Sequence, residues 1–174
     1  MVDRSWCAGR SPERRGRKLG LALGTEIGEY ATALADGIEK ALPEWIERSV
    51  ARIMTAWAGA VPEEVSAAAR SAGEQARSDL GPRLRSLLDA DIDEQATTPL
   101  AILRLLAVRY PTEVLRDAGV PPVQRDEFVE DVFPEDVYDL APAAFTDLDP
   151  DLGDVAIAWG AAKAFEHKRR HSPP

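Results

Sequence analysis

The chain is poor in the side chains that most often carry chemistry at an active site. It has one cysteine, Cys7, and two histidines, His167 and His171. A single cysteine forms no intrachain disulfide and no thiolate metal cluster. Because Cys7 stands in an Arg-rich start without an activating neighbour, we interpret it as an incidental exposed thiol. The histidines have the spacing of a metal pair, but the intervening Lys168–Arg170 favour a basic helix end over a cation site.

The sequence also lacks the short motifs that identify common enzyme sites. It contains no GxSxG nucleophile turn, no GxGxxG dinucleotide loop and no GxxxxGK[ST] phosphate loop. We therefore predict no catalytic residues and no cofactor.

No apolar run approaches the roughly 18 residues of a membrane span. The basic segment 14–18 is followed by six residues without charge, Leu19–Gly24, and Glu26 closes this run. A twin-arginine export signal begins in a similar way, but its apolar region needs about 7–15 residues. We expect a soluble cytoplasmic protein that does not bind a membrane.

Strand patterns are missing as well, because no window alternates β-branched and polar residues with a period of two. Apolar residues recur instead with the period of a helix, which predicts an all-α fold. A chain of 174 residues is expected to form one domain. We predict a flexible basic arm at 1–24, a helical domain at 25–170 and a disordered tail at 171–174.

Prolines mark most of the expected helix starts, since proline is tolerated at the first helical position. Thr98-Pro99 and Asp149-Pro150 are the clearest capped starts. The expected helices are 25–42, a second from Pro43 through Trp57, a third from Pro62 to about 80, and then 83–89, 100–108, 112–118, 124–132, 135–140 and 155–165.

Two of these segments, 100–108 and 155–165, are apolar on almost every side. Helices of that kind are buried. We expect the two to pack together at the centre of the fold, with Gly160 allowing a close approach. Their single charged residues, Arg104 and Lys163, are expected to extend outward to water.

Trp45 and Trp57 are 12 residues apart and lie on nearly the same side of the expected second helix. If the core does not cover both, the exposed remainder is a possible dimer patch. The alternative, which we slightly prefer, is that both are core residues. The chain is accordingly expected to be a monomer or a homodimer.

Negative charge is the strongest feature that is present. The formal net charge is −9, and residues 89–154 hold 17 Asp and Glu against 4 Lys and Arg, a net of −13. Such a field repels nucleic acid and attracts cations or basic protein surfaces. We expect no nucleic-acid partner, although the basic start and Lys168–Arg170 offer phosphate contacts.

The acidic face, as we call residues 126–139, is the candidate site. One interpretation is a solvated surface that binds a basic protein, which makes the chain a non-catalytic binding or regulatory module. The alternative is a divalent-metal-dependent hydrolase of nucleotide phosphates, because carboxylates four residues apart suit Mg²⁺. Another possibility is that the acids only keep the protein soluble. The candidate residues are Asp126, Glu127, Glu130, Asp131, Glu135, Asp136 and Asp139.

A second acidic run, Asp147–Asp154, invites a calcium interpretation. An EF-hand loop needs glycine at its sixth position and glutamate at its twelfth. Counted from Asp147, these positions hold Leu152 and Ala158. The run therefore predicts a helix N-terminus rather than a calcium site.

Three segments, TTPLAILRLLAVRYPTEVLRDAGVPP, FPEDVYDLAPAAF and AWGAAKAF, fall between Thr97 and Arg170. In this stretch the chain resembles an uncharacterised family of small helical proteins from GC-rich Gram-positive (actinobacterial) genomes. The excess of Arg over Lys, 17 to 4, fits such a genome. The resemblance implies a bacterial cytoplasmic protein and assigns no site residues.

Overall fold

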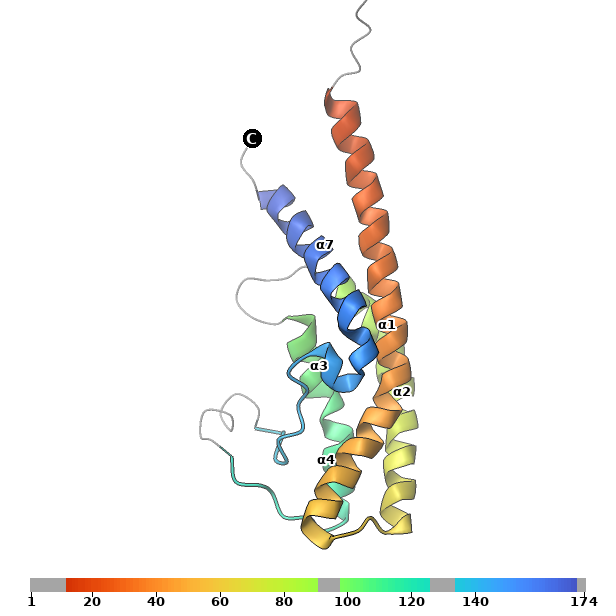
Figure 1. Cartoon of the computed structure of the whole chain (residues 1–174), viewed down its shortest axis with the longest axis vertical. Coiled ribbons are helices and arrows are strands. Elements are labelled where there is room, and N and C mark those ends of the chain that lie inside the picture. The colour runs from red at the N-terminus through yellow and green to blue at the C-terminus, as the bar shows by residue number, and fades with distance from the viewer. Residues whose placement is uncertain (1–11, 91–97, 126–133, 172–174) are drawn as a thin grey trace, which may run out of the picture.

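Two long helices form the centre of the fold. The computed structural model describes residues 12–90, 98–125 and 134–171, with side chains from Glu26 to Arg170. Helix α1 spans Pro12–Ala58 and α2 spans Glu63–Asp89. Between them the chain reverses at Gly59, whose φ of +77° suits glycine and whose N–H donates to the Thr55 carbonyl. Figure 1 shows the N-terminal end of α1 extending beyond the rest of the fold.

Two prolines lie inside helices, which corrects the prediction that they separate helices. Pro43 is within α1 and Pro82 is within α2. An interior proline removes a hydrogen bond and costs about 3 kcal/mol, but burial on both sides holds each helix together. Figure 1 shows α1 changing direction along its length, as expected of a helix with an interior proline. The flanking buried residues are Leu42 and Trp45 in α1, and Leu80 and Leu84 in α2.

The core has two adjoining parts along α1. The first lies beside the middle of α1 and includes Leu34, Ile38, Leu84, Leu103 and Trp159. The second lies beside the later half and includes Val50, Met54, Val65, Leu115 and Tyr138. The described chain is thus one all-α domain, as its helical periodicity predicted.

Two short helices follow α2. Helix α3 spans Pro99–Ala107, one residue earlier at each end than the predicted 100–108. It begins at the predicted start, where the Thr98 hydroxyl accepts the Ala101 N–H at 3.2 Å. Helix α4 spans Arg109–Asp117, so it begins three residues earlier than expected, with Pro111 in its first turn. The expected helix at 124–132 lies almost entirely outside the described residues.

The chain closes with three further elements. Helix α6 spans Phe145–Leu148, the 3₁₀ turn η1 spans Pro150–Leu152, and α7 spans Gly153–His171. The Asp149 carboxylate caps η1 by accepting the Asp151 N–H at 2.9 Å, which confirms the start predicted at Asp149-Pro150.

The predicted central pair of helices is wrong. Helix α7 packs mainly on α1, whereas α3 contacts α2 and α4. The long α1 and α2 offer more surface to each other, and the two short apolar segments fill the margins of their core. Gly160 is not a close-approach point either, because a Cβ there would meet nothing within 4 Å.

The prediction that Lys163 extends outward to water is also wrong, because the residue is buried. Its side chain is only 6% exposed, and Nζ donates to the carbonyl oxygens of Asp89 and Ala90 at 3.0 Å each. These carbonyls end α2, so Lys163 ties α7 to that helix end. Arg104, its predicted counterpart, is half-buried.

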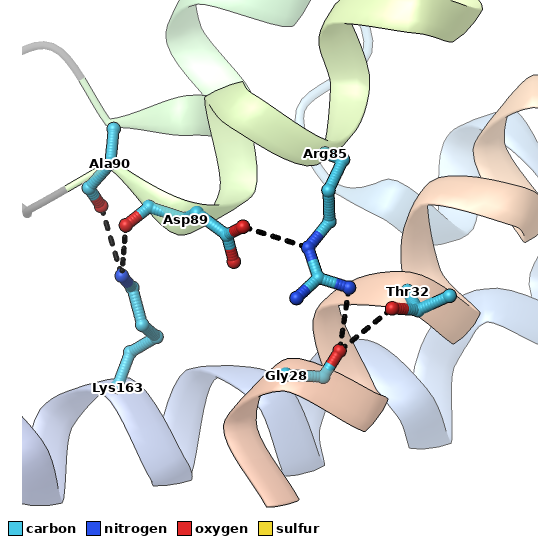
Figure 2. Close-up of polar contacts among 6 residues, drawn as sticks. All are labelled: Gly28, Thr32, Arg85, Asp89, Ala90 and Lys163. Atoms are coloured by element: carbon cyan, nitrogen blue, oxygen red, sulfur yellow. Dashed lines mark hydrogen bonds and ion pairs between the residues drawn. The ribbon is translucent and has the colours of Figure 1, made fainter. Parts of the chain in front are cut away.

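A second set of contacts at the same level joins α2 to α1. The Arg85 guanidinium donates to the Gly28 carbonyl at 2.7 Å and to the Asp89 carboxylate at 2.8 Å (Figure 2). The Thr32 hydroxyl donates to the same Gly28 carbonyl.

Residues 12–24, which the sequence placed in a basic arm, are part of α1. Among the described helices, none is long and apolar enough to cross a membrane.

Candidate acidic docking face

The structure describes three of the seven predicted acidic site residues. Glu135 and Asp139 are exposed, and Asp136 is buried with 2% of its surface accessible. The other four, Asp126, Glu127, Glu130 and Asp131, lie outside the described residues.

Asp136 organises the chain that follows it. Its Oδ1 accepts the Leu140 N–H and its Oδ2 accepts the Ala141 N–H, both at 2.7 Å. Such charge-assisted hydrogen bonds are among the stronger ones in proteins. They replace the backbone bonds of a helix, so the helix predicted at 135–140 does not form and the segment is a series of turns instead.

Neighbouring contacts fix the same segment on the second part of the core. The buried Tyr138 hydroxyl donates to the Val120 carbonyl at 2.7 Å. The Val123 N–H donates to the Val137 carbonyl at 3.0 Å. Burial of Tyr138 and Asp136 therefore leaves Glu135 and Asp139 on the outside.

Asp139 adopts a φ of +54°, the one positive φ of a non-glycine residue in the described chain. Aspartate is among the few residues that tolerate this left-handed region. Its N–H donates to the Asp136 carbonyl at 3.2 Å, which closes the turn.

Arginines from two helices lie beside these acids. Glu135 lines a hollow of about 390 Å³ together with Arg109 and Arg116 of α4. The buried Thr112 hydroxyl lines the same hollow and has no hydrogen-bond partner among the described residues. The described end of the acidic face is therefore of mixed charge.

Asp139 has a similar setting on the α1 side. It lines a hollow of about 400 Å³ with Arg48 and Arg52. Arg48 is already engaged, since its guanidinium donates to the Leu148 carbonyl at 2.7 Å and pairs with Glu44 at 3.1 Å. The sequence analysis missed Arg48 and Arg52 because α1 is distant from Asp139 in the chain. For the arginines of α4 a signal was available, since Arg109, Glu113 and Arg116 have the spacing of one side of a helix.

Within the described residues, no three His, Cys, Asp or Glu side chains are placed to hold a metal ion together. The second acidic run has a structural role instead. The Asp147 carboxylate accepts the N–H groups of Ala143 and Ala144 at 2.7 and 3.0 Å, so it holds the start of α6. His167 is half-buried on α7, and the side chain of His171 and all of Cys7 lie outside the described set.

The two tryptophans of the predicted dimer patch have different environments. Trp45 is buried in the first part of the core, with 5% exposed. Trp57, in the last turns of α1, is 50% exposed. The core covers one ring and leaves half of the other accessible.

No family model, no curated protein and no solved structure matches this chain. The fold identifies a small all-helical protein, and the resemblance to an actinobacterial family stays a prediction.

Proposed function

We propose that the chain is a non-catalytic protein-binding or regulatory module that uses its acidic face to bind a basic protein. The observation that carries the proposal is the placement of Glu135 and Asp139. Both are exposed at fixed points of a segment anchored by the buried Asp136. A pre-organised charged surface binds without the cost of ordering a loop.

The separation of the described acids supports binding over hydrolysis. A metal-dependent hydrolase brings three or more carboxylates together in one concavity with a cation opposite. Glu135 and Asp139 line two different hollows, one beside α4 and the other beside α1. Arginines in both hollows repel a bare metal cation, and they give the acidic face a polar rim of the kind that surrounds protein–protein interfaces.

The test compares two variants with the same change in charge. Glu135→Gln/Asp139→Asn removes two acids from the acidic face, and asparagine keeps the left-handed turn at 139. The control, Glu29→Gln/Asp36→Asn, removes two exposed acids from α1. Each protein is used to capture partners from a lysate of the source cells at about 0.1 M and about 1 M salt, where the Debye length falls from about 10 Å to about 3 Å.

The captured protein is then purified and its association rate with each variant is measured. We expect a basic partner whose association is slowed by salt and by the acidic-face variant, with the control unchanged, because opposite fields accelerate encounter. If both variants slow association equally, the effect comes from the net charge of the protein and not from the acidic face. Release only by Trp57→Ala would assign binding to the exposed tryptophan in the last turn of α1. Saturable Mg²⁺ binding that the acidic-face variant abolishes would support the hydrolase instead.

A further inference from the structure

Helix α7 carries an exposed apolar stripe with the spacing of a coiled-coil seam. Asp154, Ile157, Ala161, Ala164 and Lys168 follow one another at intervals of three and four residues, and all are exposed. Phe165 lies beside Ala164 on the same side. We call these six residues the outer face of α7.

The apolar members of the outer face are unusually accessible. Ile157 is 72% exposed, the highest value of any large hydrophobic residue in the described chain, and Phe165 is 52% exposed. The opposite side of α7 is covered by the fold, where Trp159 and Lys163 are buried. Figure 1 shows α7 lying beside α1, with its C-terminal end diverging from that helix.

The outer face is complementary to itself when one copy is reversed. Ala161 lies midway between Ile157 and Phe165, and also midway between Asp154 and Lys168. An antiparallel pair with its twofold axis at Ala161 therefore sets Ile157 against the partner's Phe165. It also sets Asp154 against the partner's Lys168, and each contact occurs twice.

From this complementarity we infer that the outer face of α7 binds a second copy of the chain as an antiparallel homodimer. Small side chains at Ala161 allow the two helices to approach closely at the axis. A parallel pair would set Asp154 against Asp154 and Lys168 against Lys168, so the charges select the antiparallel arrangement.

A hollow at one end of the outer face supports this geometry. It measures about 250 Å³, and Leu100, Phe145, Ala156 and Ile157 are among its lining residues. In the antiparallel pair the partner's Phe165 lies opposite Ile157, beside this hollow. The ring that is half exposed in one copy can therefore be buried against apolar side chains of the other.

The first test is the mass of the full chain in solution, measured by sedimentation over a concentration series. We expect a monomer–dimer equilibrium that Ile157→Glu and Phe165→Glu each shift to monomer. Circular dichroism should stay unchanged, because both side chains are exposed. Trp57→Ala is the control and should leave the dimer intact. A chain that stays monomeric at the highest attainable concentration overturns the proposal, as does a dimer lost only in Trp57→Ala.

Two single-cysteine variants, made in a Cys7→Ser background, then test the register of the antiparallel pair. Ala161→Cys places the two thiols across the axis and should yield a disulfide-linked dimer on mild oxidation. Ala164→Cys places them about 9 Å apart along the helices, beyond the roughly 7 Å limit for Cα atoms of a disulfide. Cross-linking at 164 but not at 161, or equally at both, would contradict the antiparallel pairing centred on Ala161.

Discussion

The ammonium nitrogen of Lys163 lies 3.0 Å from the carbonyl oxygen of Asp89, the last residue of α2. The same nitrogen is 3.0 Å from the Ala90 carbonyl oxygen. The last carbonyls of a helix have no partner within it and are favoured by a positive charge. One buried side chain of α7 thus completes the end of α2 and fixes α7 over the core (Figure 2).

Lys163→Met should lower the free energy of unfolding by about 1.5 to 3 kcal/mol, the usual contribution of a hydrogen bond to a charged group. Methionine keeps the length of the side chain but leaves two carbonyls without their donor. Lys40→Met, at an exposed position of α1, is the control and should change stability by less than about 0.5 kcal/mol. Urea denaturation measures both. Equal stability of the two variants would mean that water replaces the ammonium group at no cost.

Two glycines should respond to alanine with opposite signs. A Cβ at Gly73 would lie 2.8 Å from the Cα of Pro43, so Gly73→Ala pushes α2 away from α1 and should destabilise the fold. At Gly160 a Cβ would meet nothing within 4 Å, so Gly160→Ala should gain about 0.5 to 1 kcal/mol of helix propensity. Thermal denaturation of the two variants measures the difference. A destabilising effect of similar size at both positions would contradict the close crossing of α1 and α2 at Pro43.

These contacts also show what the sequence could and could not predict. Helical periodicity and the start at Thr98-Pro99 are local properties, and both were predicted correctly. The continuation of α1 through Pro43 was not, because the local preference of proline for a helix start is overridden by burial of Leu42 and Trp45 on either side. Burial of that kind depends on the partner helix.

The same limit applies to the candidate site. Seven acids were visible in the sequence, but the burial of Asp136 depends on where the chain turns back at Leu140. Arg48 and Arg52 lie far from Asp139 in sequence and adjoin it only because the 139–142 segment packs beside α1. Charge counted along the chain therefore overstates how uniformly acidic this surface is.

Alkaline pH should destabilise the protein through the buried Tyr138 and the half-buried Tyr110. Burial raises the pKa of Tyr138 above its ordinary value of 10.0, against a smaller lowering by Arg116. Burial and the hydrogen bond to Asp79 likewise raise the pKa of Tyr110. Below about pH 10 both states keep their protons, whereas above it the unfolded chain ionises first. The stabilising contribution is therefore lost as the pH rises through the higher pKa values of the folded state.

Denaturation midpoints at about pH 9 and about pH 11 measure this loss. Tyr138→Phe should be less stable at the lower pH, because it removes the hydrogen bond to the Val120 carbonyl. It should also lose less stability between the two pH values than the unmodified chain. A steeper loss in Tyr138→Phe would show that other groups govern the alkaline transition.

The Asp136 carboxylate should contribute more to stability than any exposed acid of the acidic face. Asp136→Ala leaves the buried N–H of Leu140 and the part-buried N–H of Ala141 without an acceptor, which should cost about 2 to 4 kcal/mol. The stability of Asp136→Asn should lie between those of the unmodified chain and Asp136→Ala, because the amide keeps one acceptor oxygen but turns a donor toward the other N–H. Glu135→Ala, at the exposed neighbouring position, should change stability by less than about 0.5 kcal/mol. Urea denaturation gives the three values, and near-ultraviolet circular dichroism reports whether Tyr138 stays packed. If Asp136→Ala is as stable as Glu135→Ala and keeps its aromatic signal, then the 134–141 segment is held by Tyr138 and Leu140 alone, and the exposed positions of Glu135 and Asp139 do not depend on the buried carboxylate.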